Sequence, residues 1–167
     1  SALGAFDNVD FSKYDVRFKC EVYYGNEKKV LPVQYGRGTT AVTTATFPVR
    51  LIANRDYRFV VWADLVKEGN YTENVWSNED GLHYNTTDLH NITLKKTWVA
   101  MDETRDAFTG HFDTAVDGDQ TTYNGAKNIS FTLTRPFAKL RVITTDMEQL
   151  NDLTITPTKA KVVYTSD

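Results

Sequence analysis

Apolar and polar residues alternate along residues 14–24. The apolar phase contains Tyr14, Val16, Phe18, Cys20, Val22 and Tyr24, and the polar phase contains Asp15, Arg17, Lys19 and Glu21. A period of two residues is that of a β-strand, whereas a helix would scatter these apolar residues around its circumference. The pattern therefore predicts a long strand with one face on a core and the other face in water.

Further strands are predicted by the same test at residues 44–53, 57–64, 89–101, 131–145, 153–156 and 160–164. The segment 131–145 changes phase at Pro136, which indicates a bulge or a crossover, since one extra residue reverses the side-chain alternation. No segment shows a sustained helical period. The prediction is an all-β fold, a Greek-key β-sandwich of about seven strands with little or no helix.

Length and composition agree with this class and narrow the possible partners. The chain has 167 residues, with nine Tyr and nine Phe, and we expect residues 1–167 to form a single β-sandwich domain. Lys and Arg number 19 against 22 Asp and Glu, a net charge of −3, which argues against a nucleic-acid partner. No apolar run reaches the length of a transmembrane helix, so no spanning segment is predicted.

The sequence contains no motif for catalysis, metal binding or cofactor binding. Phosphate-binding loops, nucleophile elbows and paired zinc ligands are absent. Cys20 lies on the apolar phase, which predicts a buried, inert thiol. The spacing of His83, His90 and His111 matches no common ligand pattern, so they are interpreted as surface residues. We expect no enzyme, cofactor or metal site; a hydrolase whose carboxylates converge only in the fold is the remaining alternative of that class.

A long polar segment at residues 67–88 carries the aromatic residues Tyr71, Trp76 and Tyr84. Aromatic faces in a loop can stack on sugar rings, so these three residues are candidate contacts for a glycan or another partner. A solvated crossover is an equally good interpretation of this segment. A carbohydrate-binding module that uses these loop aromatics is therefore an alternative function.

Three segments in order along the chain carry a family resemblance. The sequence RPFAKL occupies residues 135–140, "WAD" occupies residues 62–64 in a predicted strand, and residues 105–110 read RDAFTG, which we expect to form a turn. Together they resemble the fimbrillin-like surface proteins of Bacteroides-type bacteria. The shared residues, which we expect to specify the fold rather than to bind a ligand, are Trp62, Asp64, Phe108, Arg135, Pro136 and Phe137.

The resemblance implies a transthyretin-like β-sandwich in a lipid-anchored or pilus-assembled protein of the bacterial outer membrane or cell surface. It implies adhesion through other fimbrial subunits, host or bacterial surface proteins, or glycans. Residues 1–167 would be the N-terminal domain of a longer protein with a lipoprotein signal and a second sandwich. Polymerising members of the family accept a neighbour's strand, and here a groove lined by Phe18, Val22 and Leu140 would have to stay open to do so.

Roles for the shared residues follow from their chemistry. Asp64 is expected to cap a turn or to accept backbone N–H groups at the end of its strand. Arg135 is expected to pair with a carboxylate or with backbone carbonyls. Pro136 cannot donate a hydrogen bond to a neighbouring strand, so it marks the bulge.

Overall fold

A computed structural model of the chain describes residues 5–69, 81–97, 102–117 and 128–137. The chain divides into two units, Ser1–Pro136 and Phe137–Asp167, so the boundary falls at the proline where the sequence pattern changes phase. All residues that the structure describes belong to the first unit, except Phe137.

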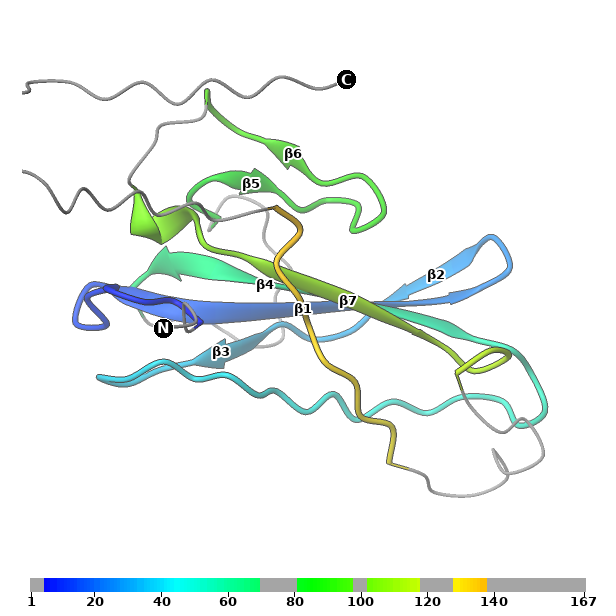
Figure 1. Ribbon diagram of the computed structural model, residues 1–167. Coiled ribbons are helices and arrows are strands. Elements are labelled where there is room, and N and C mark those ends of the chain that lie inside the picture. The colour runs from blue at the N-terminus through cyan, green and yellow to red at the C-terminus, as the bar shows by residue number, and fades with distance from the viewer. Residues whose placement is uncertain (1–4, 70–80, 98–101, 118–127, 138–167) are drawn as a thin grey trace, which may run out of the picture. The chain divides into compact units, whose positions relative to one another are not determined.

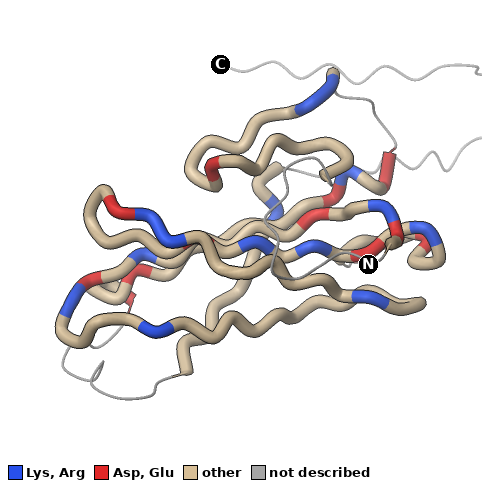
Figure 2. The backbone as a smooth tube through the Cα atoms, turned by 180° about the vertical axis from the view of Figure 1, so that it is seen from behind, with Lys and Arg blue, Asp and Glu red and all other residues tan. Residues whose placement is uncertain are grey.

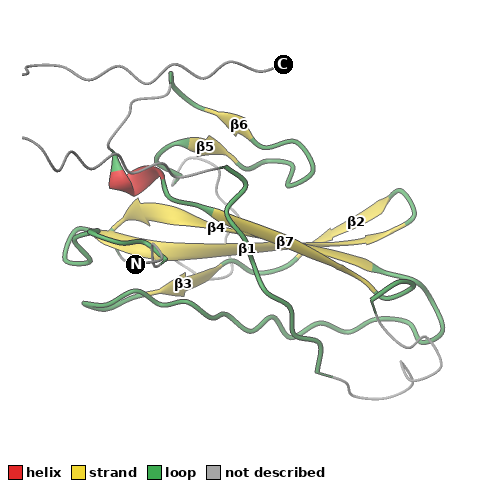
Figure 3. Ribbon diagram, in the orientation of Figure 1, coloured by secondary structure: helices red, strands yellow, loops and turns green. Residues whose placement is uncertain are grey.

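The first unit is built on a five-stranded antiparallel sheet (Figures 1 and 3). Its strands are β1 (Tyr14–Tyr24), β2 (Glu27–Val30), β3 (Gln34–Gly36), β4 (Arg58–Lys67) and β7 (Phe108–Asp113). A second, two-stranded sheet pairs β5 (Tyr84–Asn85) with β6 (Thr93–Leu94), and the 3-10 turn η1 spans Glu103–Arg105. The predicted all-β class is confirmed, with seven strands in two sheets among the described residues.

The long strand β1 lies in the middle of the large sheet. On one side it pairs with β4 over its whole length, and β4 pairs in turn with β7. On the other side β2 and β3 follow one another along its edge, interrupted where Pro32 stands between them. The β1–β2 hairpin turns at Gly25 and Asn26, and the φ of +55° at Gly25 is one that glycine adopts without steric cost.

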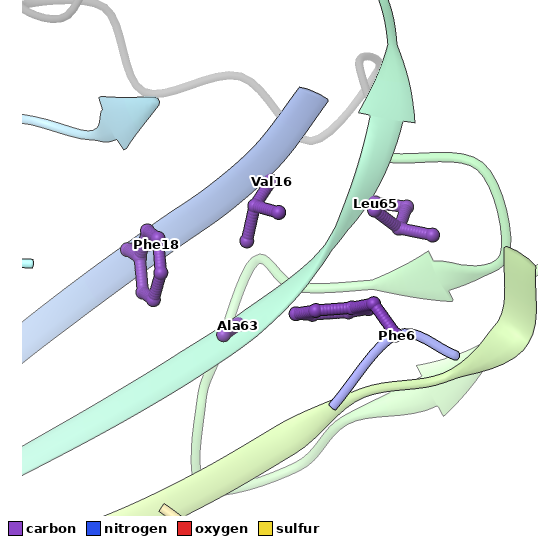
Figure 4. Packing of buried hydrophobic residues seen from close by; sticks show 5 residues of the cluster. All are labelled: Phe6, Val16, Phe18, Ala63 and Leu65. Carbon is purple, nitrogen blue, oxygen red and sulfur yellow. The ribbon is translucent and has the colours of Figure 1, made fainter. Parts of the chain in front are cut away.

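The apolar phase of β1 forms the core, as its alternation predicts. The register places Val16 opposite Leu65 and Phe18 opposite Ala63, and Phe6 packs against the same group (Figure 4). A second cluster continues along the same face and consists of Cys20, Val22, Leu31, Phe59 and Val61. Two stretches of chain, residues 41–49 and 129–133, cover this face with half-buried apolar side chains.

The groove that strand donation would require is filled at Phe18 and Val22. Each of these side chains is 3% exposed, and Val22 belongs to the cluster against which Phe47 and Phe131 pack. Leu140, the third expected lining residue, lies outside the described residues. In the described part of the chain the core face is therefore closed within the first unit, which argues against an open acceptor groove at these positions.

Several predicted strands differ from the observed elements. Residues 44–53 are not a strand but a connection that buries Phe47 and Val49 alternately, and residues 89–97 contain only the short β6. The segment expected to turn at residues 105–110 is instead the end of η1 followed by the start of β7. Of the predicted strand at 131–145, residue Thr134 forms a single bridge with Thr109, and residues 138–145, 153–156 and 160–164 lie outside the described residues.

Within the described ranges no helix is long and apolar enough to cross a membrane.

Candidate functional site

The polar phase of β1 is buried, which corrects the prediction that this face meets water. Asp15, Arg17, Lys19 and Glu21 are each 2% exposed or less. Segment 81–90 covers them, with Tyr84, Thr86 and Leu89 facing the sheet as buried residues. Charged positions accordingly lie within the long central strands as well as in the loops (Figure 2). The sheet has an apolar layer on one face and a layer of paired charges on the other.

The centre of this polar layer is an ion pair between neighbouring strands. Arg17 Nε lies 2.8 Å from Asp64 Oδ1 and Arg17 Nη2 lies 2.6 Å from Oδ2, with both side chains almost completely inaccessible to solvent. The pair is bidentate, the strongest common arrangement of these two groups. Asp64 stands inside β4 rather than at its end, so the expected role as a turn cap is wrong. Its register position opposite Arg17 gives it a different partner.

The other charges of the polar layer also have partners. Lys19 Nζ donates to Thr86 Oγ1 at 2.7 Å. Glu21 accepts hydrogen bonds from the Tyr23 hydroxyl and from the backbone N–H of Leu89, the latter at 3.2 Å. Burial, and then the hydrogen bond to Glu21, raise the pKa of Tyr23. These groups hold β1 to the segment that covers it.

Tyr84 is part of the same buried layer and not a glycan platform. The side chain is 4% exposed, its ring meets Trp62 edge-on at 5.1 Å, and its hydroxyl donates to the carbonyl oxygen of Arg105. Burial raises its pKa. A ring enclosed in this way cannot stack on a sugar, so the expected contact at Tyr84 is wrong. Tyr71 and Trp76, the other two candidates, lie outside the described residues.

The residues shared with the fimbrillin-like motifs are engaged in internal contacts. Arg135 makes a bidentate pair with Asp106, with Nε–Oδ1 2.8 Å and Nη2–Oδ2 2.9 Å, and its guanidinium lies 4.9 Å from the centre of the Phe108 ring. Asp106 Oδ2 also accepts the backbone N–H of Phe6 at 3.0 Å. The hydrogen bond to Asp106 raises the pKa of Arg135. These contacts tie the chain before Pro136 to the start of β7.

The remaining motif residues lie in the interior or at the unit boundary. Trp62 is 3% exposed in β4, and its buried indole N–H has no hydrogen-bond partner among the residues that the structure describes. Pro136 is exposed and ends the first unit, and Phe137, which begins the second, is half-buried.

Two sequence predictions about reactive side chains have opposite outcomes. Cys20 is buried as expected, and burial raises the pKa of its thiol to about 12. His83, expected on the surface, is half-buried instead, with Nε2 2.7 Å from Thr104 Oγ1. Burial, followed by the charge of Arg105, lowers the pKa of His83. No group of three or more His, Cys, Asp or Glu side chains among the described residues could hold a metal ion.

An exposed surface that combines aromatic, aliphatic and charged side chains lies at the β1–β2 hairpin end of the sheet. We call it the tip surface. It surrounds a cavity of about 230 Å³ and comprises Val22, Tyr24, Glu27, Lys28, Lys29, Arg50, Leu51, Ile52, Arg55 and Tyr57. Four of these residues are cationic and one is anionic, a local charge of +3. Because the whole chain carries −3, the remaining residues carry −6.

Apolar side chains are exposed at the tip surface although the loop around them is well held. Ile52 is 58% exposed and Tyr24 38% exposed. The Tyr57 hydroxyl accepts the N–H of Ile52 at 3.1 Å and faces the Ile52 carbonyl oxygen at 3.3 Å, which fixes the loop. The Arg55 guanidinium lies 4.7 Å above the centre of the Tyr24 ring. The arrangement places exposed aromatic and arginine side chains together, and these residue types are enriched at the centres of protein interfaces.

The alternation of apolar residues did not identify the tip surface. The pattern places Leu51 and Ile52 in a predicted strand, in which successive side chains alternate, so one of the two would face the core. The Gly25–Asn26 pair between two extended segments was an available hairpin signal. Another was the density of Arg and Tyr in residues 50–58, although only the fold brings that stretch to Tyr24.

Comparison with known proteins gives one match. No curated protein and no solved structure matches the chain. The model of a family of unknown function, DUF6562, matches residues 1–167, the whole of the sequence. This chain therefore belongs to the DUF6562 family.

Proposed function

We propose that this chain is a non-enzymatic adhesin or fimbrial component of a bacterial cell surface, related to the fimbrillin-like proteins, and that it acts by contact through the tip surface. Its partners would be other fimbrial subunits, or host or bacterial surface proteins. An extracytoplasmic location and a lipid anchor at the outer membrane belong to the same proposal, and they rest on the motif resemblance.

The observation that carries the proposal is the exposure of Ile52, in a loop that is held in place, beside the exposed Tyr24 at the end of β1. Flexible loops expose apolar groups transiently, but Tyr57 fixes the backbone beneath Ile52 through two contacts. A fixed surface loses little conformational freedom on binding, so more of its contact energy contributes to affinity. Exposed apolar groups that are rimmed by charge typically mark an interaction site.

The internal use of the buried charges supports a contact function in a second way. Two ion pairs, Arg17 with Asp64 and Arg135 with Asp106, engage charged groups internally. A catalytic role would require such groups to be available to a substrate. The two pairs join strands β1 and β4, and the chain before Pro136 to the start of β7. Such a framework holds loops in fixed positions at its ends, where the tip surface lies.

The test is adhesion of beads coated with the purified chain to layers of matrix proteins, to epithelial cells and to the chain itself. The variant Tyr24→Ser/Ile52→Ser should lower the number of bound beads at least about fivefold on the substratum that the chain recognises. Val116→Ser is the matched control, because Val116 is 80% exposed and does not line the tip surface. All variants should keep the parent melting temperature. Equal adhesion by the tip variant and the control, or binding to no substratum, would contradict the proposal.

A further inference from the structure

A second hollow lies on the polar face of the sheet, where β4, β7 and the loop before β6 meet. It has a volume of about 300 Å³ and is lined by Arg58, Val60, Leu89, His90, Thr109, Gly110, His111 and Thr134. We call it the edge pocket. It shares no lining residue with the tip surface. A cavity of this size is at the small end of the range for ligand sites and suits a single sugar-sized ring.

The edge pocket is lined by basic side chains in an acidic chain. It carries one arginine and two histidines, and none of its eight lining residues is an acid. The carboxylate of Asp113 lies 3.6 Å from Arg58 Nε. That contact is an ion pair and is too long for a hydrogen bond to one of the five N–H donors of the guanidinium. The carboxylates of Asp88 and Glu21 are engaged by the backbone N–H groups of His90 and Leu89, respectively. The lining therefore selects for a ligand with a negative charge.

Backbone geometry provides a further donor at the same place. Thr109 exchanges both of its backbone hydrogen bonds with Thr134, at 2.8 Å each, so its N–H and C=O point away from β4. Residues two apart in a strand direct their backbone groups to the same side. The N–H of His111, a residue that lines the edge pocket, therefore points toward the same edge of β7. A backbone N–H beside a guanidinium is a suitable arrangement for a carboxylate.

The rest of the lining suits the body of a polyol ring. Val60 and Leu89 are almost completely buried and form an apolar floor. The His90 ring is stacked on Tyr23 with centroids 4.2 Å apart and planes at 16°, and its backbone N–H is held by Asp88 at 2.9 Å. The Thr109 hydroxyl donates to the Val61 carbonyl oxygen at 3.1 Å, which leaves its oxygen lone pairs to accept from a ligand hydroxyl.

We propose that the edge pocket binds a single acidic sugar ring, a hexuronate residue, whose carboxylate is held by Arg58 and the backbone N–H of His111. The apolar floor and the His90 ring would contact the C–H groups of the sugar. The site does not depend on the tip surface, so either proposal can fail without the other.

The experiment is a titration of the ¹⁵N-labelled chain with methyl β-glucuronide, followed by amide chemical shifts. We expect saturable shifts at His111, Gly110 and His90, and weaker binding of the uncharged methyl β-glucoside. Arg58→Gln should weaken glucuronide binding about tenfold, the scale expected for loss of a charge-assisted hydrogen bond. Arg50→Gln, which removes an arginine from the tip surface, is the matched control and should bind as the parent does.

Any of the following three results would overturn the proposal. Equal affinity for acetate and for the glucuronide would show a simple anion site with no recognition of the ring. Equal affinity for the glucoside would remove the role of the carboxylate. Shifts confined to Tyr24 and Ile52 would place the sugar at the tip surface instead. A His111→Ala variant that stays folded separates the backbone contact from the side chain, since it should retain most of the glucuronide affinity.

Discussion

Replacing Asp64 with leucine should destabilise the first unit by about 3–5 kcal/mol. The substitution removes the carboxylate that accepts hydrogen bonds from both Nε and Nη2 of Arg17. Arg17 is completely buried, so water cannot take the place of the lost carboxylate without opening the layer that covers it. The estimate is that of a buried ion pair from which one partner is removed, and it greatly exceeds the loss expected from any exposed pair.

The same reasoning predicts a different result for the double variant Arg17→Met/Asp64→Leu, which should lose little or no stability. Both charges are then absent, and two apolar side chains of similar volume fill the space. Such replacements are often neutral, or stabilising by about 1–4 kcal/mol. We therefore expect the double variant to be much more stable than Asp64→Leu alone, with a coupling energy of several kcal/mol between the two positions.

Urea unfolding followed by tryptophan fluorescence measures these differences, since Trp62 is buried beside the pair. In a thermal melt, the melting temperature of the single variant should fall by about 2–4 °C for each kcal/mol lost from its free energy of unfolding. Lys13→Ala is the matched control, because the pair of Lys13 with Asp10 at 3.2 Å is exposed, and no measurable loss is expected. A loss below about 1 kcal/mol for Asp64→Leu, or equal losses for the single and double variants, would refute the argument.

Three further measurements test other parts of the first unit. Gly81→Ala should cost about 1–3 kcal/mol in urea unfolding, because its Cβ would lie 2.6 Å from Arg17 Nη2 and force that side chain to move. The thiol of Cys20 should react with a disulfide reagent no faster than the unit unfolds, since it is buried and its pKa is raised to about 12; rapid labelling of the native chain would contradict this. Burial and Arg105 lower the pKa of His83, so the unfolded state binds its proton more tightly, and the stability this gives is present above about pH 6.5 and lost as the pH falls. His83→Gln should make the stability profile flatter between pH 7 and 5, and a profile identical to that of the parent would exclude His83 as its source.

The strands with the strongest alternation could be predicted, and those without it could not. β1 shows apolar alternation and β4 a continuous apolar run, and both are rich in β-branched and aromatic residues, which is a local signal. β2 and β3 are short, and β2 is exposed at all four positions, so they exist because β1 offers them an edge. Residues 44–53 show the reverse case, since they alternate but lie across the core face without joining a sheet.

The buried charge layer could not be predicted because its partners are distant in the sequence. Arg17 and Asp64 are 47 residues apart, and they meet only through the register of β1 with β4. A charged phase on an isolated strand normally indicates solvent. The covering segment at residues 81–90 reverses that interpretation, and its polar sequence gave no indication that it would pack on a sheet. The edge pocket has the same origin, because Arg58 comes from β4, His111 from β7 and His90 from the loop between β5 and β6.

The polar layer explains how the sheet fixes its register and why recognition is expected at its margins. A slip of β1 by one residue would place Arg17 opposite Ala63 or Leu65 and would turn its charge into the apolar core. The bidentate geometry with Asp64 excludes that alternative more strongly than apolar packing alone, because an unpaired buried charge is far more costly than a loosely packed methyl group. Charges used in this way cannot also be presented to a partner. The cations at the tip surface and the bases of the edge pocket lie instead where the covering segments end, so a single chain can separate the residues that specify its fold from those available for binding.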